Sequence, residues 1–357
     1  MLKILDRYIL KQYLGAFLLL LCLFIPIMIT VHIAEKIGKI LSKDIPFAEV
    51  MMYLLDFTIY FSNFLFPIFL FISTMFFTSK LANNTEIVAF LSSGVSYNRF
   101  LRPYIIGAVL VCVTALVFST VFVPDAAAGF NEFQFKYFKS EKERQTNNVF
   151  RRISDDDYVY VSNYNSGRKT GYDFTLEHFN GNELEYKIYA ERIAFKDSIY
   201  TLSRYKKRVL QENGEILTTK AKLDTILNFD IDELTPSSYV AETLSYQKLL
   251  DFIETEESRG NGNMNVYYVE KHKRTSIPVS ALIFTIIAVA VSSVKKRGGM
   301  GVNLAIGLAI AMSYMFLDKV FGTIAEKSTS FEPWIAVWAP NIFFGIVALL
   351  LIRNARR

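Results

Sequence analysis

Long uncharged apolar runs alternate with charged segments along this chain, and the alternation sets out its organisation. Three runs of 22 or 23 residues come early and three of 20 residues come late: 12–34, 57–79, 103–124, 275–294, 298–317 and 333–352. A helix that crosses the ~30 Å hydrocarbon layer of a bilayer needs roughly 20 apolar residues, because each residue adds ~1.5 Å. The pattern therefore predicts six transmembrane helices in two groups of three.

The segment between the two groups has the pattern of strands. Apolar and polar residues alternate in five stretches, which are 157–162, 172–177, 184–189, 199–203 and 216–229. Turn residues such as Asn180-Gly181-Asn182 separate them, and no helical period lies between them. Short spacing of this kind predicts an antiparallel sandwich or jellyroll rather than alternating strands and helices. After it, Tyr246, Leu249 and Ile253 have helical spacing.

The predicted fold is thus an α-helical membrane protein with six transmembrane helices (3+3) and an inserted all-β jellyroll-like domain. Residues 1–124 would hold helices 1–3, and residues 125–240 the β domain. Residues 241–274 would form a helical connector, and residues 275–357 would hold helices 4–6.

The net charge of +5 is explained by membrane topology. Twelve Lys and Arg residues flank the runs on the side that carries both termini, against five in the opposite short loops. The twelve are Lys3, Arg7, Lys11, Lys80, Arg99, Arg102, Lys295, Lys296, Arg297, Arg353, Arg356 and Arg357. Because cytoplasmic loops are enriched in Lys and Arg, both termini are expected in the cytoplasm and the β domain outside it. A basic charge of this origin does not indicate a nucleic-acid partner.

Residues 83–94, between the second and third runs, predict a short amphipathic helix. Asn83 would cap it with Glu86 three residues later, and Gly94 would end it. Its apolar residues include Ile87, Phe90 and Leu91. Two interpretations stay open: an interfacial helix in which Glu86 only caps, or a coupling helix that docks into a cytoplasmic motor.

A basic face is predicted at the outer end of the first helix. His32, Lys36, Lys39 and Lys43 are separated by four, three and four residues, so they share one side of a continuous helix. A basic face at headgroup depth suits phosphate-bearing amphiphiles. The alternative is that these long side chains simply extend into the aqueous rim.

Small residues recur at every fourth position of the fifth helix. They are Gly301, Ala305, Ala309 and Ser313. Such a stripe lets another helix approach closely. The sequence leaves open whether that contact is permanent packing within the chain or a movable contact.

No enzymatic motif is present in the sequence. Metal-ligand spacings, hydrolase motifs and ATP-binding motifs are all missing, so no catalytic residue, metal or cofactor is expected. The six runs hold no ionisable residue that could couple transport to an ion gradient, so energy would come from another subunit. A membrane-anchored lipid-modifying enzyme, or a partner-binding protein with an external β domain, stays as the alternative.

Over its full length the chain resembles the LptF/LptG family of lipopolysaccharide export permeases. The resemblance rests on the layout of three helices, β domain and three helices, and on several short motifs. These are Leu5-Asp6-Arg7-Tyr8-Ile9, Asn84-Thr85-Glu86-Ile87 with Ser93-Gly94, Leu244-Ser245-Tyr246, Glu270 with His272-Lys273-Arg274, and Trp338-Ala339-Pro340-Asn341. The first motif slightly favours the LptG side of the family.

The resemblance implies a transport mechanism. A second LptF/LptG-type permease would pair with this chain, and an LptB-like ATPase dimer would bind the coupling helices, with Glu86 as a contact. Lipopolysaccharide would enter from the outer leaflet of the inner membrane, between the first helix of one permease and the fifth of the other, and pass to LptC- and LptA-like bridge proteins. The basic face would contact its phosphates. Where relatives often carry a Lys on the first helix, this chain has His32, and Lys39 matches better.

Overall fold

The computed structural model describes residues 4–138, 147–165, 168–196, 199–211, 214–227, 229, 239–260, 264–294, 299–327 and 331–355. The chain divides into two compact units. A helical unit comprises Met1–Asn131, Glu242–Tyr246 and Asn265–Arg357, and a β unit comprises Glu132–Ala241 and Gln247–Met264. Six of the basic residues used for topology lie outside the described residues: Lys3, Lys295, Lys296, Arg297, Arg356 and Arg357.

Six helical stretches in the described part of the chain are long and apolar enough to cross a membrane, which confirms the predicted number. They are α1 (Ile4–Ser42), α2 (Phe47–Asn83), the continuous stretch Tyr97–Phe138, α9 (Met264–Ser292), α10 (Gly299–Lys327) and α11 (Pro333–Ala355). The third stretch joins α4 (Tyr97–Val117), the π-helical turn η1 (Phe118–Phe122), α5 (Val123–Phe133) and η2 (Gln134–Phe138). The short α3 (Glu86–Ser92) lies between α2 and α4.

The helices extend well beyond the charge-free runs. α1 has 39 residues, and it ends just before Asp44, which adopts a left-handed conformation at φ 46°. Pro46 then lies directly before the first residue of α2. α9 begins at Met264, so Glu270, Lys273 and Arg274 lie within it. The helices therefore carry charged residues beyond the charge-free runs, because a charged residue does not end a helix whereas a left-handed turn does.

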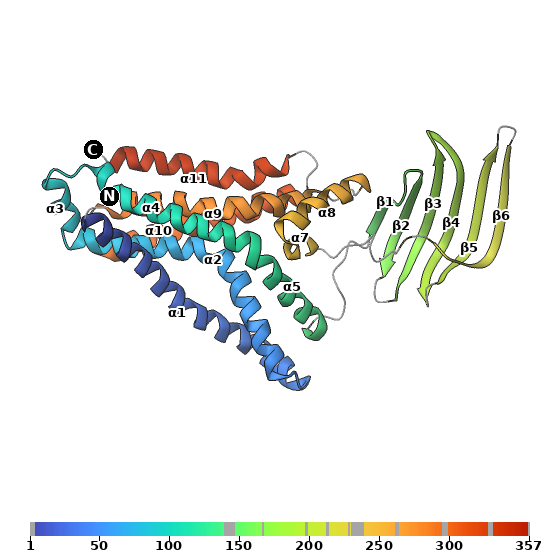
Figure 1. Ribbon diagram of the computed structural model, residues 1–357, viewed down its shortest axis with the longest axis horizontal. Coiled ribbons are helices and arrows are strands. Elements are labelled where there is room, and N and C mark those ends of the chain that lie inside the picture. Colours follow the sequence, from blue (N-terminus) through green and yellow to red (C-terminus); the bar gives the residue numbers. More distant parts are fainter. Residues whose placement is uncertain are drawn as a thin grey trace. The chain divides into compact units, whose positions relative to one another are not determined.

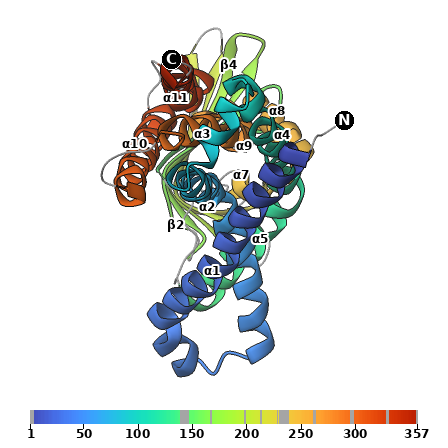
Figure 2. The same ribbon diagram turned by 90° about the vertical axis from the view of Figure 1, so that its left-hand side faces the viewer.

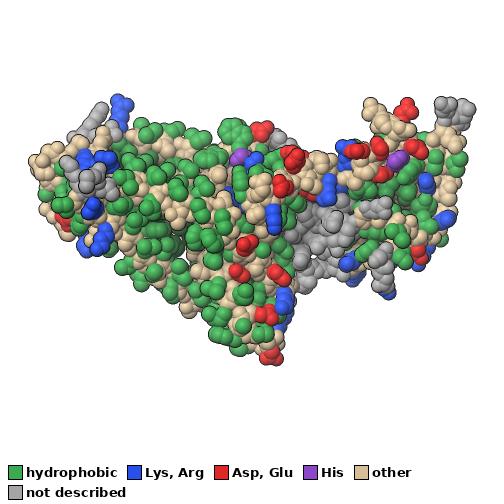
Figure 3. All heavy atoms as spheres, in the orientation of Figure 1, with side chains coloured by type: hydrophobic (Ala, Val, Ile, Leu, Met, Phe, Trp, Pro, Cys, Tyr) green, Lys and Arg blue, Asp and Glu red, His purple; other side chains and the backbone are tan. Residues whose placement is uncertain are grey.

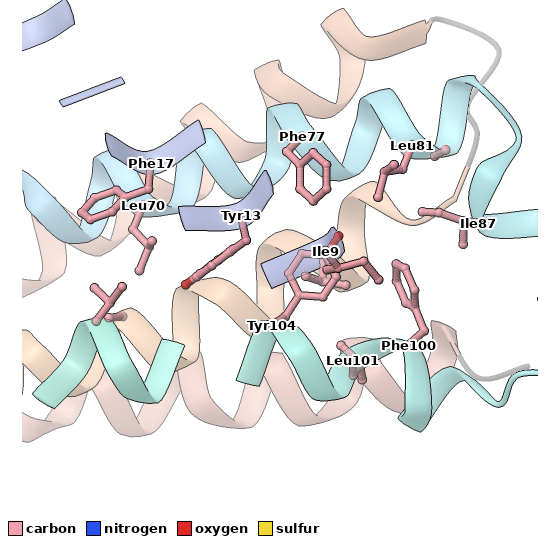
Figure 4. Packing of buried hydrophobic residues seen from close by; sticks show 14 of the residues in the cluster. Ile9, Tyr13, Phe17, Leu70, Phe77, Leu81, Ile87, Phe100, Leu101 and Tyr104 are labelled. Atoms are coloured by element: carbon pink, nitrogen blue, oxygen red, sulfur yellow. The ribbon is translucent and has the colours of Figure 1, made fainter. Parts of the chain in front are cut away.

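The chain's two ends and α3 lie together at one end of the helical unit, here named the terminal end (Figure 1). Ile9 and Tyr13 of α1 pack there against Phe100 and Tyr104 of α4, all without solvent exposure (Figure 4). Beyond this core α1 diverges from α9, α10 and α11 (Figures 1 and 2). Hydrophobic side chains cover the middle of the visible face, and Lys and Arg gather at the terminal end (Figure 3).

The described residues of the β unit form one antiparallel sheet. Its strands pair in chain order: β1 (Asn147–Arg152), β2 (Asp157–Asn165), β3 (Thr170–Asn180), β4 (Glu183–Lys196), β5 (Ile199–Gln211) and β6 (Gly214–Thr225). The antiparallel β domain is confirmed, but among the described residues the connections are those of a meander rather than of a sandwich or jellyroll. The alternation predicted β2 to β6 and missed β1. Its Arg151 is 1% exposed, so the strand lacks a regular polar face.

Two short helices follow the sheet in sequence, α7 (Val240–Thr243) and α8 (Tyr246–Ser258). α8 starts directly after Ser245, as the helical spacing predicted. Within the β unit it is joined to β1, because Glu256 of α8 is fully buried and forms an ion pair with Arg151 at 3.7 Å. The backbone N–H of Arg152 also donates to the carbonyl of Arg259 at 2.7 Å.

Candidate functional site

The predicted coupling helix is α3, at the terminal end of the helical unit (Figure 1). Asn83 does not cap it, because α2 continues to Asn83 and the residue before α3 is Thr85, in a left-handed conformation at φ 62° without a side-chain cap. The C-terminal prediction is correct. Gly94 has φ 84°, its N–H donates to Leu91, and the N–H of Val95 donates to Phe90, which is a Schellman motif.

The apolar residues of α3 point in two directions. Ile87 is 2% exposed and belongs to the terminal-end core, and Phe90 packs against the same core (Figure 4). Val88 and Leu91 are exposed by 57% and 39%. Ile87 therefore anchors the helix, whereas Val88 and Leu91 form an apolar surface that no other part of the described chain covers.

Glu86 is held by two neighbours. The Tyr8 hydroxyl of α1 donates to its Oε2 at 3.3 Å, and the Asn84 side-chain amide donates to its Oε1 at 3.3 Å. This arrangement rules out the interpretation of Glu86 as part of a capping box with Asn83. The carboxylate lies half-buried.

A second contact joins α1 to the helix that follows α3. Arg99 of α4 forms an ion pair with Asp6 at 2.7 Å, and Asp6 is 1% exposed. The Ser96 hydroxyl caps α4 by accepting the N–H of Arg99. α1 is thus bound both to the first residue of α3 and to the helix that follows α3.

The predicted basic face lies along the other end of α1, but its residues differ in their contacts and exposure. The Nε2 atom of His32 lies 2.6 Å from the Tyr53 hydroxyl, and its ring stacks on Phe57 at a centroid distance of 3.9 Å. His32 therefore holds α1 against α2. Its predicted contact with lipopolysaccharide stays a prediction.

Two of the three lysines of the face are more accessible than His32. Lys36 is half-buried, and Lys39 and Lys43 are exposed. All three belong to the last turns of α1 or to the turn that follows it. The structure therefore keeps Lys36, Lys39 and Lys43 together at one end of α1, far along the chain from the Asp6 and Tyr8 contacts.

The small residues predicted on the fifth helix form an uncovered face of α10. Gly301, Ala305, Ala309 and Ser313 are all exposed, whereas Gly307 and Ala311 on the other side are buried. A Cβ built on Gly307 would lie 2.0 Å from the sulfur of Met75. The stripe is therefore not used for packing within the described part of this chain, and it is available to another helix.

One polar site was missed by the sequence reasoning. Charged residues of α7, α9 and α10 line a cavity of about 300 Å³ beside α2. They are Glu242, Glu270, Lys273, Arg274, Asp318 and Lys319. The sequence did contain a signal for this site. Acidic and basic residues occur together within two helical turns of the start of one apolar run, 275–294, and of the end of another, 298–317.

An apolar cavity of about 500 Å³ lies between α1, α2 and α4. It forms where α1 diverges from its neighbours, and Phe17, Phe66 and Val111 are among its lining residues. The sequence pattern could not predict it, because apolar residues that line a cavity and those that fill a core look alike.

Comparison with known proteins identifies the family. A search of curated proteins found no match. The profile described as "Lipopolysaccharide export system permease LptF/LptG" matches residues 7–354, which is nearly the whole chain. The matched region covers the inserted sheet and all six apolar helices except the first three residues of α1 and the last residue of α11. The chain therefore belongs to the LptF/LptG family of lipopolysaccharide export permeases.

Proposed function

We propose that this chain is one of two paired permeases in an ABC-type exporter, in which a separate LptB-like ATPase dimer supplies the energy. Membership of the family makes the chain a permease component of lipopolysaccharide export in the inner membrane. In the proposal the terminal end faces the cytoplasm and the β unit faces the periplasm. LptC- and LptA-like proteins receive the lipopolysaccharide there.

The observation that carries the proposal is the construction of α3. A seven-residue helix outside the spans is fixed by the buried Ile87, and it leaves Val88 and Leu91 exposed, with the half-buried Glu86 at its first turn. Two exposed apolar side chains and a carboxylate on a different side of the same short helix suit a partner groove that has an apolar floor and a basic rim. Val88 replaces Ile87 in the proposed contact, since Ile87 is unavailable.

The lipid route would use the two uncovered features of α1 and α10. The lysines at the far end of α1 suit phosphate groups, and the small-residue face of α10 suits close approach of the partner's α1. Together they would form a side opening through which lipopolysaccharide leaves the outer leaflet.

Co-purification tests the ATPase contact. The permease is expressed with its genomic ATPase and second permease, and ATPase retention in detergent is measured for the wild type, Glu86→Lys, Leu91→Glu and the control Glu35→Lys. We expect Glu86→Lys and Leu91→Glu to lose the ATPase. The charge reversal should weaken the free energy of ATPase binding by about 1–3 kcal/mol. The control, at the other end of α1, should retain it. Equal retention by all four proteins would contradict the proposed contact.

Crosslinking tests the lipid route. A photoreactive amino acid at Ile37 should crosslink to lipopolysaccharide, and Lys36→Glu combined with Lys39→Glu should abolish the crosslink. Persistence of the crosslink in the double variant would contradict a role for the basic face.

A further inference from the structure

The apolar cavity and the charged cavity described above lie on adjacent sides of α2 and share one lining residue. Asn63 lines both the apolar and the charged cavity. The consecutive residues Phe118 and Ser119 of η1 line one cavity each. The apolar cavity therefore adjoins the charged cavity, in the same way that the apolar tail of an amphiphile adjoins its polar headgroup.

The apolar cavity needs an occupant made of hydrocarbon. An empty cavity of about 500 Å³ would forfeit the dispersion contacts of its lining side chains. Water would find few partners there, since polar groups such as Thr58, Ser62 and Thr114 are a minority among the lining residues. An acyl chain from the surrounding bilayer supplies the missing contacts.

The charged cavity holds three acidic and three basic side chains, so its formal charge is balanced. Several are engaged already. The Tyr60 hydroxyl donates to Glu242 at 2.6 Å, Arg274 donates to Glu270 at 3.1 Å, and Lys273 lies 3.5 Å from Glu326. An anionic headgroup alone would leave the carboxylates of the cavity facing further negative charge.

Asp318 indicates which kind of lipid headgroup the charged cavity would bind. It lies half-buried on the spanning helix α10, and it forms no hydrogen bond and no ion pair within 4.0 Å with any described residue. Lys273 and Lys319 act on it only through longer-range electrostatics. A carboxylate in a spanning helix is costly unless it is paired, and a primary ammonium group would provide a charge-assisted partner.

We propose that the adjoining cavities form a site for one zwitterionic aminophospholipid of the bilayer. An acyl chain lies in the apolar cavity, the phosphate meets Lys319 and Lys273, and the ammonium group meets Asp318. The bound lipid is a bilayer component and not the exported cargo, so the site does not depend on what the permease transports.

Lipid analysis of the full-length permease tests the site. The chain is purified in a mild detergent with whatever subunits it retains, washed extensively, and its bound lipids are extracted and identified by mass spectrometry. We expect one phosphatidylethanolamine per chain. Ala115→Phe, which fills the apolar cavity, and Asp318→Asn, which removes the partner of the ammonium group, should each lower its retention about tenfold. The matched controls are Leu116→Phe, on the neighbouring exposed position of α4, and Asp125→Asn, an exposed acid of α5.

A second measurement does not depend on the folding of a variant. Phosphatidylethanolamine or phosphatidylglycerol is added back to delipidated wild-type protein, and the melting temperature is recorded. Stabilisation by phosphatidylethanolamine alone supports the site. Equal stabilisation by both lipids would overturn it. It would equally be overturned by retention of lipopolysaccharide or phosphatidylglycerol in place of phosphatidylethanolamine, or by variants that retain as much lipid as their controls.

Discussion

The Tyr8 hydroxyl donates a hydrogen bond to the Glu86 carboxylate at 3.3 Å, and this bond joins the first spanning helix directly to α3. It connects residues 78 positions apart in sequence. The proposed ATPase contact on α3 and the proposed lipid contact at the far end of α1 are therefore joined through a single helix.

Tyr8→Phe should weaken the response to the ATPase without abolishing its binding. The variant removes one hydrogen bond to a carboxylate, and because Tyr8 is 41% exposed the loss should be only about 0.5–1 kcal/mol. ATPase stimulation by the permease pair should fall about twofold to fivefold. Glu86→Gln and the double variant complete a thermodynamic cycle, and strictly additive effects would show that the two groups do not act together.

Asp6→Ala should destabilise the permease more than an exposed change beside it. The substitution leaves Arg99 without its partner in a pair that is buried on the Asp6 side, which should cost about 1–3 kcal/mol. The melting temperature in detergent should fall, and Arg7→Gln, one residue along α1 and exposed, should leave it nearly unchanged. Equal melting temperatures for both variants would contradict the importance of the pair.

Gly107→Ala and Gly15→Ala should shift stability in opposite directions. A Cβ at Gly107 would lie 2.6 Å from the ring of the fully buried Tyr13, so overpacking should cost about 1–3 kcal/mol. Gly15, on α1, has nothing within 4 Å, and alanine there should stabilise the helix by about 0.5–1 kcal/mol. Thermal unfolding of both variants checks the prediction.

Enlarging the small-residue face of α10 should impair pairing of the permeases. Ala305→Leu with Ala309→Leu should reduce co-purification of the second permease while leaving the fold of this chain intact, because both positions are exposed here. The double Ser variant keeps the side chains small and should pair normally. If the Leu variant pairs as well as the Ser variant, close approach at this face is not required.

Low pH should stabilise the β unit through His178. Its Nδ1 lies 2.8 Å from Asp157, and this hydrogen bond, followed by nearby negative charges, raises the pKa of the imidazole above its ordinary value. A raised folded-state pKa gives stabilisation that is complete below the ordinary value of about 6.5 and is lost as the pH rises through the folded-state value. The difference in melting temperature between wild type and His178→Gln should therefore be largest near pH ~5.5 and fall to a constant, smaller value at alkaline pH. A constant difference would contradict this linkage.

The sequence predicted the parts of the fold that depend on local pattern. Charge-free runs gave the number of spans, alternation gave β2 to β6, and Gly94 gave the end of α3. Side-chain direction was not predictable in the same way. Ile87 and Leu91 look equivalent as apolar residues of one helix, but the packing of α1 and α4 buries Ile87 and leaves Leu91 accessible. The partners of His32 and Asp6 likewise come from other helices, and one sequence contains no record of such contacts.

The close contact between Tyr13 and Gly107 has a mechanical consequence. If α1 turns as a stiff rod about that contact, Tyr8 lies ~8 Å to one side and Lys39 lies ~39 Å to the other, at ~1.5 Å per residue. The two arms of this lever differ about fivefold, so a shift of ~1 Å imposed on Tyr8 through Glu86 corresponds to ~5 Å at Lys39. Pro26 lies in the long arm, and bending there would determine how much of the displacement reaches the lysines.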